Sequence, residues 1–447
     1  MSPLFLSGLV VFAVIFLLVQ ILYLRLDAFV ALLITSLVVA VLGGVPPAEV
    51  IDVITEGMGG TLGYIAVVIG LGAMIGEVLR RTGGAKEIAE ALLRRSGDEK
   101  APWALSLTGL IVAIPVFFDV ALVLFIPLVY SLVERSGRSL LYYAIPLLAG
   151  IAVAHACIPP TPGPVAVAAL IGADLGWVIV FGVVAGIPAV LVGGIWFGRF
   201  IGNRIHLEVP EYMQLDEEVA HAGTTPSFLS SVGIIAFPLA LILAGTVSEV
   251  WLGEDHTAGP WVTFIGHPIT ALTLAILLTF YLLGIRHGYS MNEVRSMTRK
   301  GLEPVGMIIL VTGAGGVLGN VLIETGVGEV LAEAMAASNL PVVLLAFMVA
   351  TAVRVSQGSA TVSMVTAAGL MAPVAEAGDF SAPLLGMITI AIASGATVLS
   401  HVNDSGFWLV SRFLGMDEAQ TLKSWTVMET LVGGVAFLVV LVLSLLI

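Results

Sequence analysis

Four short clusters of polar and helix-breaking residues interrupt otherwise apolar stretches of this sequence. The clusters are Pro115-Val-Phe-Phe-Asp119, His155 followed by Pro159 to Pro164, Arg354 to Thr361, and His401 followed by Asn403 to Gly406. Each cluster joins a break in a helix to side chains that could bind an anion or a proton. We therefore expect the four clusters to meet at one site.

The cluster at 354–361 has the chemistry to bind an organic anion. Ser356, Gln357, Ser359 and Thr361 surround Gly358. Their hydroxyl and amide groups could hydrogen-bond a carboxylate and the hydroxyls of a polyol without carrying a full charge. The alternative is that the hydroxyls bond to carbonyls of their own helices, which is common in membrane proteins.

Charged and titratable residues in the clusters are candidates for binding a proton. Asp119 and Asp404 are costly at membrane depth unless they are paired, protonated or solvated, so we expect one of them to be the main proton carrier. His155 and His401 are the alternates because imidazole titrates near neutral pH, although each could be a hydrogen-bonded packing residue. Arg354 could pair with a substrate carboxylate, or it could neutralise Asp119 or Asp404 in a structural ion pair.

Broken helix ends supply a second kind of contact. Helix N-termini at a break present free N–H groups and a partial positive charge, which suit an anion. We therefore add Thr161, Pro162 and Gly163 from one cluster and Asn403 and Ser405 from another to the predicted substrate site.

The elements that must position these residues are membrane helices. Of the 447 residues, 58% are hydrophobic and 11% are charged, whereas soluble domains are nearer 45–50% apolar and about 25% charged. Full crossings are predicted at 4–24, 28–43, 60–79, 177–200, 227–247, 261–284, 305–323 and 428–447. We expect broken spans at about 140–173 and 382–411. We expect re-entrant hairpins at about 102–133 and 340–373, because each half of these two stretches is too short to cross the membrane by itself.

An internal repeat organises these elements. The segment Gly70–Gly83 resembles Gly313–Gly326, and five crossings per copy would make the second copy enter the membrane from the opposite face. The predicted fold is an all-α polytopic membrane protein with two inverted-topology repeats, each of five spans plus one re-entrant hairpin, with one broken span per repeat. The predicted units are residues 1–200, an acidic cytoplasmic linker at 201–226, and residues 227–447.

Charge placement predicts the orientation and excludes other classes. With both termini outside the cell, every basic residue except Arg354 falls in a cytoplasmic loop, as expected for an inner membrane protein. A net charge of −13 argues against a nucleic-acid partner, and the single Cys157 cannot form a metal cluster alone. No nucleotide-binding loop, zinc motif or hydrolase elbow is present, so we expect no enzyme activity, no metal and no cofactor beyond a coupling ion.

Several motifs resemble the gluconate permease family of gluconate:proton symporters, in the ion transporter superfamily. They are Ile114–Val120, His155–Pro164, Arg354–Thr361 and Ser400–Trp408, and the resemblance covers about residues 55–447. It implies two inverted repeats, a mobile transport part that moves as an elevator within a homodimer embedded in lipid, and a small sugar-acid or hydroxy-carboxylate substrate. Thr161 stands where the best-known members have histidine, so the resemblance implies a hydroxy-acid anion more firmly than gluconate itself.

Three other functions remain open from the sequence. Relatives in the superfamily suggest a sodium-coupled carboxylate carrier as the main alternative to proton coupling. An anion channel would be expected to have a pore lined by repeated rings, which one chain with paired breaks does not suggest. An intramembrane enzyme would require a nucleophile with a base, and none stands out.

Overall fold

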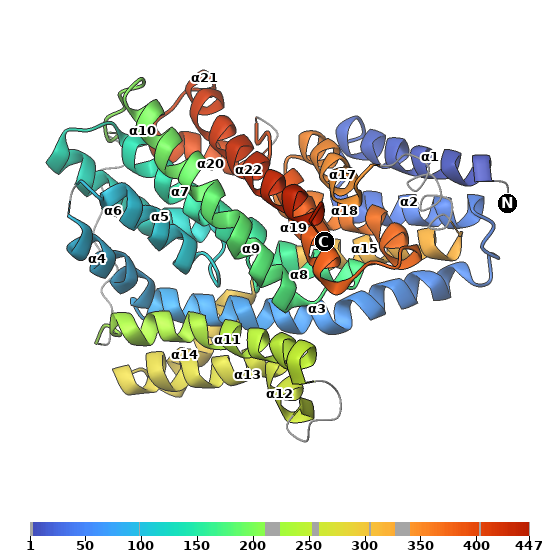
Figure 1. The fold of residues 1–447 in the computed structure, drawn as a ribbon, viewed down its shortest axis with the longest axis horizontal. Coiled ribbons are helices and arrows are strands. Elements are labelled where there is room, and N and C mark those ends of the chain that lie inside the picture. The colour runs from blue at the N-terminus through green and yellow to red at the C-terminus, as the bar shows by residue number, and fades with distance from the viewer. Residues whose placement is uncertain are drawn as a thin grey trace.

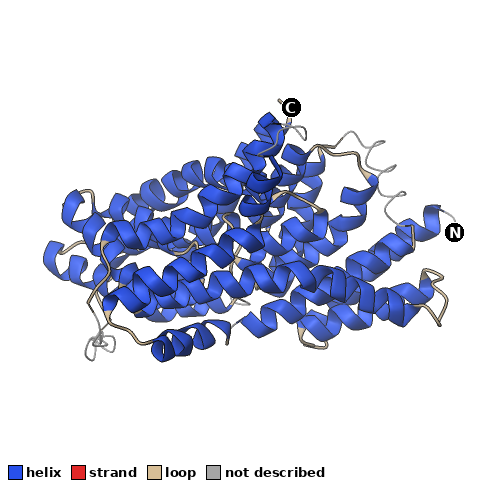
Figure 2. Cartoon of the chain, turned by 90° about the horizontal axis from the view of Figure 1, so that it is seen from below, coloured by secondary structure: helices blue, strands red, loops and turns tan. Residues whose placement is uncertain are grey.

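The structure is a computed structural model that describes residues 3–97, 99–210, 224–252, 259–303, 305–326, 340–401 and 404–446. Within these residues every regular element is a helix and no strand occurs (Figure 2). The all-α prediction is confirmed. Residues 211–223, half of the predicted linker at 201–226, lie outside the described residues.

The first half of the chain contains long helices interrupted at two places. Its elements are α1 (Pro3–Leu22), α2 (Ala28–Leu42), α3 (Val50–Arg81), α4 (Gly84–Ser96), α5 (Ala101–Val112), α6 (Phe118–Ser136), α7 (Leu140–Cys157), α8 (Pro162–Ile171), α9 (Leu175–Ala189), η1 (Val190–Trp196) and α10 (Phe197–Gly202). The interruptions lie between α5 and α6 and between α7 and α8, at the proline-containing clusters of the sequence.

The second half has a similar order of elements. They are α11 (Phe228–Leu252), α12 (Gly259–Gly266), α13 (Pro268–Thr279), η3 (Phe280–Gly284), η4 (Ile285–His287), α14 (Met291–Leu302), α15 (Val305–Glu324), α17 (Val342–Gln357), α18 (Ala360–Ala377), α19 (Ala382–Gly395), α20 (Ser405–Leu414), α21 (Glu418–Thr421), η5 (Leu422–Thr426) and α22 (Val427–Ser444). Interruptions again lie at two places, between α17 and α18 and between α19 and α20.

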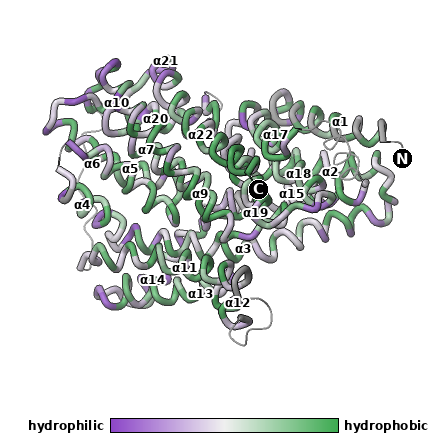
Figure 3. Tube along the Cα trace, viewed as in Figure 1, coloured by the Kyte–Doolittle hydropathy of each residue, from purple (hydrophilic) through white to green (hydrophobic). Residues whose placement is uncertain are grey.

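Seven helical segments of the described chain are long and apolar enough to cross a membrane, and hydrophobic residues predominate along them in Figure 3. The chain is therefore an integral membrane protein with several spans. Several predicted boundaries differ: α3 begins at Val50 rather than at 60, the predicted crossing 261–284 is divided between α12 and α13, and the last helical segment begins at Glu418 rather than at 428. Asp52 and Glu56 place the start of the apolar stretch after them. The helix itself begins earlier, because charged residues are compatible with a helix outside the hydrocarbon core.

α3 is a central element of the fold. It packs against α15 from the second half and also against α13 and α14. Figure 1 shows α11, α13 and α14 along one side of α3, with most of the other helices on the opposite side. Gly76 of α3 lies so close to the break between α5 and α6 that an added Cβ would be 1.8 Å from the carbonyl oxygen of Pro115. This glycine therefore allows the break to dock onto α3.

Local backbone geometry repeats at a spacing of 243 positions. Gly83 and Gly326 both have positive φ angles, 80° and 73°. Gly172 and Gly415 likewise end α8 and α20 in the left-handed conformation. Asp174 and Asp417 are each the N-cap of the next helix, and each accepts a hydrogen bond from the backbone N–H three residues later. The sequence repeat is thus accompanied by repeated local structure.

Candidate functional site

A cavity of about 280 Å³ lies where the helix breaks meet. We call it the central cavity, and its volume is near the lower end of the range for ligand pockets, about 300–1,000 Å³. Its lining comes from both halves of the chain. The lining residues are Phe117, Phe118, Asp119, Ala152, His155, Ala156, Val311, Arg354, Ser359, Ala360, Thr361, Val362, Val365, Thr397, Asp404, Gly406, Trp425 and Glu429.

A buried ion pair lies in the wall of the central cavity. Nη2 of Arg354 is 2.5 Å from Oδ2 of Asp404, and the two side chains are 2% and 10% exposed. Arg354 is in the last turn of α17 and Asp404 is the N-cap of α20, where its Oδ1 accepts a hydrogen bond from Gly406 N at 2.9 Å. Both charges therefore lie at the helix ends that favour them.

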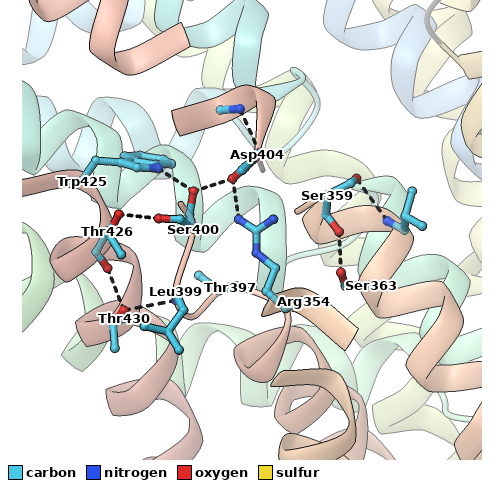
Figure 4. A network of polar contacts seen from close by, with 12 residues as sticks. Arg354, Ser359, Ser363, Thr397, Leu399, Ser400, Asp404, Trp425, Thr426 and Thr430 are labelled. Atoms are coloured by element: carbon cyan, nitrogen blue, oxygen red, sulfur yellow. Dashed lines mark hydrogen bonds and ion pairs between the residues drawn. The ribbon is translucent and has the colours of Figure 1, made fainter. Parts of the chain in front are cut away.

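A polar network around Ser400 holds this ion pair in place (Figure 4). Ser400 Oγ donates to Asp404 Oδ2 at 2.5 Å and accepts from Trp425 Nε1 at 2.7 Å. Thr426 donates its hydroxyl to the carbonyl of Ser400. Trp425 and Thr426 belong to η5, so this single π-helical turn fixes the break between α19 and α20 relative to α22. Such π-helical turns are frequent at functional sites.

The break between α19 and α20 also contains a strained residue. Leu399 has a φ angle of 54°, a conformation that costs a residue with a side chain about 1–3 kcal/mol. Its backbone N–H donates to Thr430 Oγ1 at 3.2 Å. This hydrogen bond from α22 therefore helps to maintain the unusual backbone beside Ser400.

Arg354 has further donors that no described residue satisfies. Its Nε and Nη1 are buried and have no hydrogen-bond partner within the described residues. Leaving buried donors of a charged group unpaired is costly, typically more than about 1–3 kcal/mol. The carboxylate of a bound anion would pair with them.

Hydroxyl groups at the start of α18 line the same cavity. Ser359 is the N-cap of α18 and accepts from Val362 N at 3.4 Å, and Thr361 lies in the first turn. Gly358 ends α17 with a φ angle of 80°, which lets the chain reverse direction there. The first turn of α18 thus faces the cavity, and its N–H groups and helix dipole suit an anion.

Two of the predicted residues from the first half also line the central cavity. Asp119 lies in the first turn of α6 and is exposed. His155 lies in the last turn of α7, where its Nδ1 is buried without a partner among the described residues. The structure therefore brings together Asp119, His155, Arg354, Ser359, Thr361 and Asp404 around one cavity.

Other predicted residues lie beside the central cavity instead. Thr161 and Pro162 line a cleft of only about 10 Å³, and the Thr161 hydroxyl donates to the carbonyl of Ile158 at 2.7 Å. Gly163 packs against Met364, whose sulfur would be 2.6 Å from an added Cβ. In this conformation the three residues support the break between α7 and α8 rather than line the cavity.

The remaining predicted residues are described only in part. His401 accepts a hydrogen bond from Asp404 N through its carbonyl at 2.8 Å. Its ring is not among the groups that line the cavity. Asn403 lies outside the described residues, as do the side chains of Ser356, Gln357 and Ser405.

Glu429 is not among the residues that the sequence predicts for the site. This residue lines the central cavity from α22, and it is 5% exposed. The apolar run at 428–447 predicts a plain crossing, but an acidic residue within an apolar helix is itself a functional signal. Phe117, Phe118 and Trp425 were also missed, because aromatic residues are too frequent in membrane helices to distinguish a cavity wall from a lipid-facing surface.

A second hollow of about 350 Å³ adjoins the break between α5 and α6. We call it the basic vestibule, and its lining residues are Ala73, Gly76, Glu77, Arg80, Arg81, Pro115, Val116, Phe117, Lys300, Gly301 and Glu303. Glu77 accepts hydrogen bonds from Arg80 and Arg81 at 2.6 Å each. Phe117 lines both hollows, so its side chain lies between the central cavity and the basic vestibule.

Comparison with known proteins identifies the family of the chain. Residues 5–446 match the family described as GntP family permease. The low-affinity gluconate transporter of Escherichia coli K12 is 40% identical over 93% of both chains. The Gnt-II system L-idonate transporter of the same organism is 33% identical over 94% of both chains.

A solved structure has a related fold. The Alcanivorax borkumensis YdaH transporter aligns with 93% of this chain and 97% of its own, at 12% sequence identity and a TM-score of 0.62. At that identity the likeness concerns the fold alone. Together with the match over almost the whole sequence, these findings show that the chain belongs to the GntP permease family and is a transporter rather than an enzyme.

Proposed function

We propose that this permease is a secondary active transporter that carries a gluconate-like sugar acid, or a similar small hydroxy-carboxylate, together with a proton. The observation that carries the proposal is the central cavity, in which Arg354 has unpaired guanidinium nitrogens beside the hydroxyl groups of Ser359 and Thr361. A guanidinium group pairs well with a carboxylate. Hydroxyl groups and the N-terminus of α18 complement the hydroxylated part of such an anion.

The relatives support this substrate class. They include transporters named for gluconate and for L-idonate, which are both hydroxylated monocarboxylates. The polar groups predicted in the same region, Ser356, Gln357, Asn403 and Ser405, would add contacts to the substrate hydroxyls. Thr161, Pro162 and Gly163 would act from the adjoining break.

Proton coupling is supported by the acids around the cavity. Asp119 and Asp404 line it, His155 lines it as well, and His401 lies beside Asp404. Carboxyl groups at membrane depth gain and lose protons readily when their surroundings change. Sodium coupling is the alternative, since broken helices can also present carbonyl groups to a cation.

The proposed mechanism is alternating access by an elevator movement. Support for two inverted repeats comes from the pairs Gly83 and Gly326, Gly172 and Gly415, and Asp174 and Asp417, which share backbone geometry at a constant spacing. In this proposal α5–α6 and α17–α18 are re-entrant hairpins. A mobile transport part carries the central cavity across the membrane within a homodimer.

The proposed location is a bacterial inner membrane, with both termini outside the cytoplasm. The segments α4, α10 and α21 lie toward one end of the long axis in Figure 1, and the N-terminus lies at the other end. Basic residues are concentrated in and around those three helices. That distribution fits a cytoplasmic side at their end.

Uptake by the purified protein in liposomes tests the proposal. We expect gluconate to accumulate above its external concentration when the outside is made acidic, and not when only a sodium gradient is applied. Accumulation driven only by sodium would replace proton coupling with sodium coupling. Equilibration without accumulation, together with an ionic current, would indicate a channel instead.

A further inference from the structure

The acids of the central cavity outnumber its cations. Three carboxyl groups line it, those of Asp119, Asp404 and Glu429, together with one guanidinium group, that of Arg354. His155 is the other titratable group in the lining. If all three acids were ionised, an incoming anion would meet an excess of negative charge, and like charges at close range repel strongly in a low-dielectric site. Neutralising one of the acids lowers this excess and so favours anion binding.

The three acids differ in how their charge is compensated. Asp404 has the ion pair with Arg354 and accepts hydrogen bonds from Ser400 and from Gly406 N. Asp119 is exposed and lies in the first turn of α6, where the helix dipole favours a negative charge. Asp404 is therefore compensated by a cation and by hydrogen bonds, and Asp119 by solvent and by the helix dipole.

Glu429 has neither kind of compensation. It is 5% exposed, and within the described residues its carboxyl group has no hydrogen bond and no ion pair. It lies inside the continuous helical segment 418–444, so no helix N-terminus stabilises it. A buried carboxylate without a partner is expensive, and its protonated form costs much less.

Glu429 also lies within the electrostatic reach of the anion-binding group. Arg354 on α17 and Asp404 at the start of α20 act on it through the cavity. Cys157, at the end of α7, is the further titratable group near Glu429. When Glu429 is ionised it competes with a substrate for the positive charge of Arg354, and when it is neutral the unpaired Nε and Nη1 of Arg354 are left for the substrate carboxylate.

We infer that Glu429 binds the co-transported proton, so that the central cavity accepts the substrate anion when this carboxyl group is neutral. The inference rests on the proposed function. A proton from the external water attaches to the Glu429 carboxylate, one anion binds beside it, and both leave on the other side. The loaded cavity thus gains one positive and one negative charge. By linkage, the proton must promote anion binding as much as the anion promotes protonation.

The test compares Glu429→Gln with the unmutated protein in liposomes, with gluconate as the probe. Glutamine imitates the neutral carboxyl group, so we expect Glu429→Gln to keep gluconate exchange and to lose accumulation driven by a pH gradient. Its apparent affinity should not depend on pH. The affinity of the unmutated protein should fall by about tenfold per pH unit at alkaline pH, as for one linked proton. Glu376→Gln, an exposed Glu-to-Gln change at the far end of α18, is the matched control and should behave as the unmutated protein.

The outcomes separate this inference from the proposed function. If the unmutated protein accumulates gluconate only under a sodium gradient, the proposed proton coupling fails before any variant is considered. If the unmutated protein is driven by pH and Glu429→Gln is driven equally well, only the assignment of Glu429 is wrong. A folded Glu429→Gln protein that neither binds nor exchanges gluconate would also overturn it.

A measurement on the unmutated protein covers the case in which Glu429→Gln does not fold. Calorimetric titration with gluconate in buffers of different ionisation enthalpy reports the protons taken up on binding. We expect close to one proton at alkaline pH, and Glu429→Asp should shift the pH dependence without abolishing it. Binding without proton uptake, or an unshifted profile in Glu429→Asp, would contradict the inference.

Discussion

The guanidinium group of Arg354 and the carboxylate of Asp404 form a buried ion pair, 2.5 Å apart, between the end of α17 and the start of α20. The pair joins two separate helix breaks across the central cavity. It uses only one of the guanidinium nitrogens, because Nε and Nη1 have no partner within the described residues. Arg354 can therefore serve both roles suggested by the sequence: it forms a structural ion pair with Asp404, and it has free donors for a substrate carboxylate.

Breaking this pair from either side should destabilise the fold. Arg354→Gln and Asp404→Asn should each lower the free energy of unfolding by about 3–5 kcal/mol, because each leaves an uncompensated buried charge. The double variant should lose less than the sum, since neither charge remains. Thermal unfolding of the purified variants measures this coupling. Additive losses would mean that the two side chains do not interact in the folded protein.

Transport separates the second role of Arg354 from the first. We expect the double variant Arg354→Gln/Asp404→Asn to fold and yet to bind gluconate poorly, because the substrate carboxylate has lost its cation. Arg354→Lys should weaken transport less, since it keeps the charge but not the planar fork of donors. Unchanged apparent affinity in the double variant would remove Arg354 from the substrate site.

A pair of glycines on α3 provides a matched test of how the first break is held. Gly76→Ala places a methyl group against the carbonyl of Pro115, so the break between α5 and α6 must move and transport should fall sharply. Gly60→Ala on the same helix meets nothing within 4 Å, and alanine favours a helix by up to about 1 kcal/mol. We expect it to transport normally and to be slightly more stable. Equal activity of the two variants would contradict the close docking.

The positions of the breaks could be predicted from the sequence because prolines and glycines act locally. Pro115 and Gly358 stand within the observed interruptions for this reason. The partner of Arg354 could not be predicted, since 49 residues of chain separate it from Asp404 and both Asp119 and Asp404 were possible partners. The acid at Glu429 marks α22 as unusual, but its place in the cavity wall could not be predicted, because the apolar residues of α22 show no periodicity that tells which face meets the cavity.

Residues at opposite ends of the predicted spans test the orientation. In a Cys157→Ala background, we expect Glu49→Cys to react with a membrane-impermeant maleimide in intact cells and Ser296→Cys to react only after the membrane is opened. Both positions are exposed in the structure, so access depends on the side of the membrane and not on burial. The opposite pattern would reverse the predicted orientation without affecting the fold.

Phe117 separates the central cavity from the basic vestibule. It is the N-cap residue of α6, directly after the break, and its side chain lines both hollows. The vestibule has three cations, Arg80, Arg81 and Lys300, and two acids, Glu77 and Glu303, so its net charge is positive by one and favours an anion. We therefore expect the ring to form the barrier that the proposed alternating access requires between the cavity and one side of the membrane.

Removing that ring should uncouple transport. In Phe117→Ala the two hollows would join, so we expect faster gluconate exchange, a proton leak in liposomes without substrate, and a lower accumulation ratio. Phe117→Leu keeps most of the bulk and should remain coupled. Phe118→Ala provides the comparison, because Phe118 lines the central cavity but not the basic vestibule, and it packs against Trp425, with ring centroids 5.4 Å apart. That variant should weaken gluconate binding without a leak. A pH-sensitive dye inside the liposomes measures the leak, and a tightly coupled Phe117→Ala protein would mean that the barrier lies elsewhere along the path.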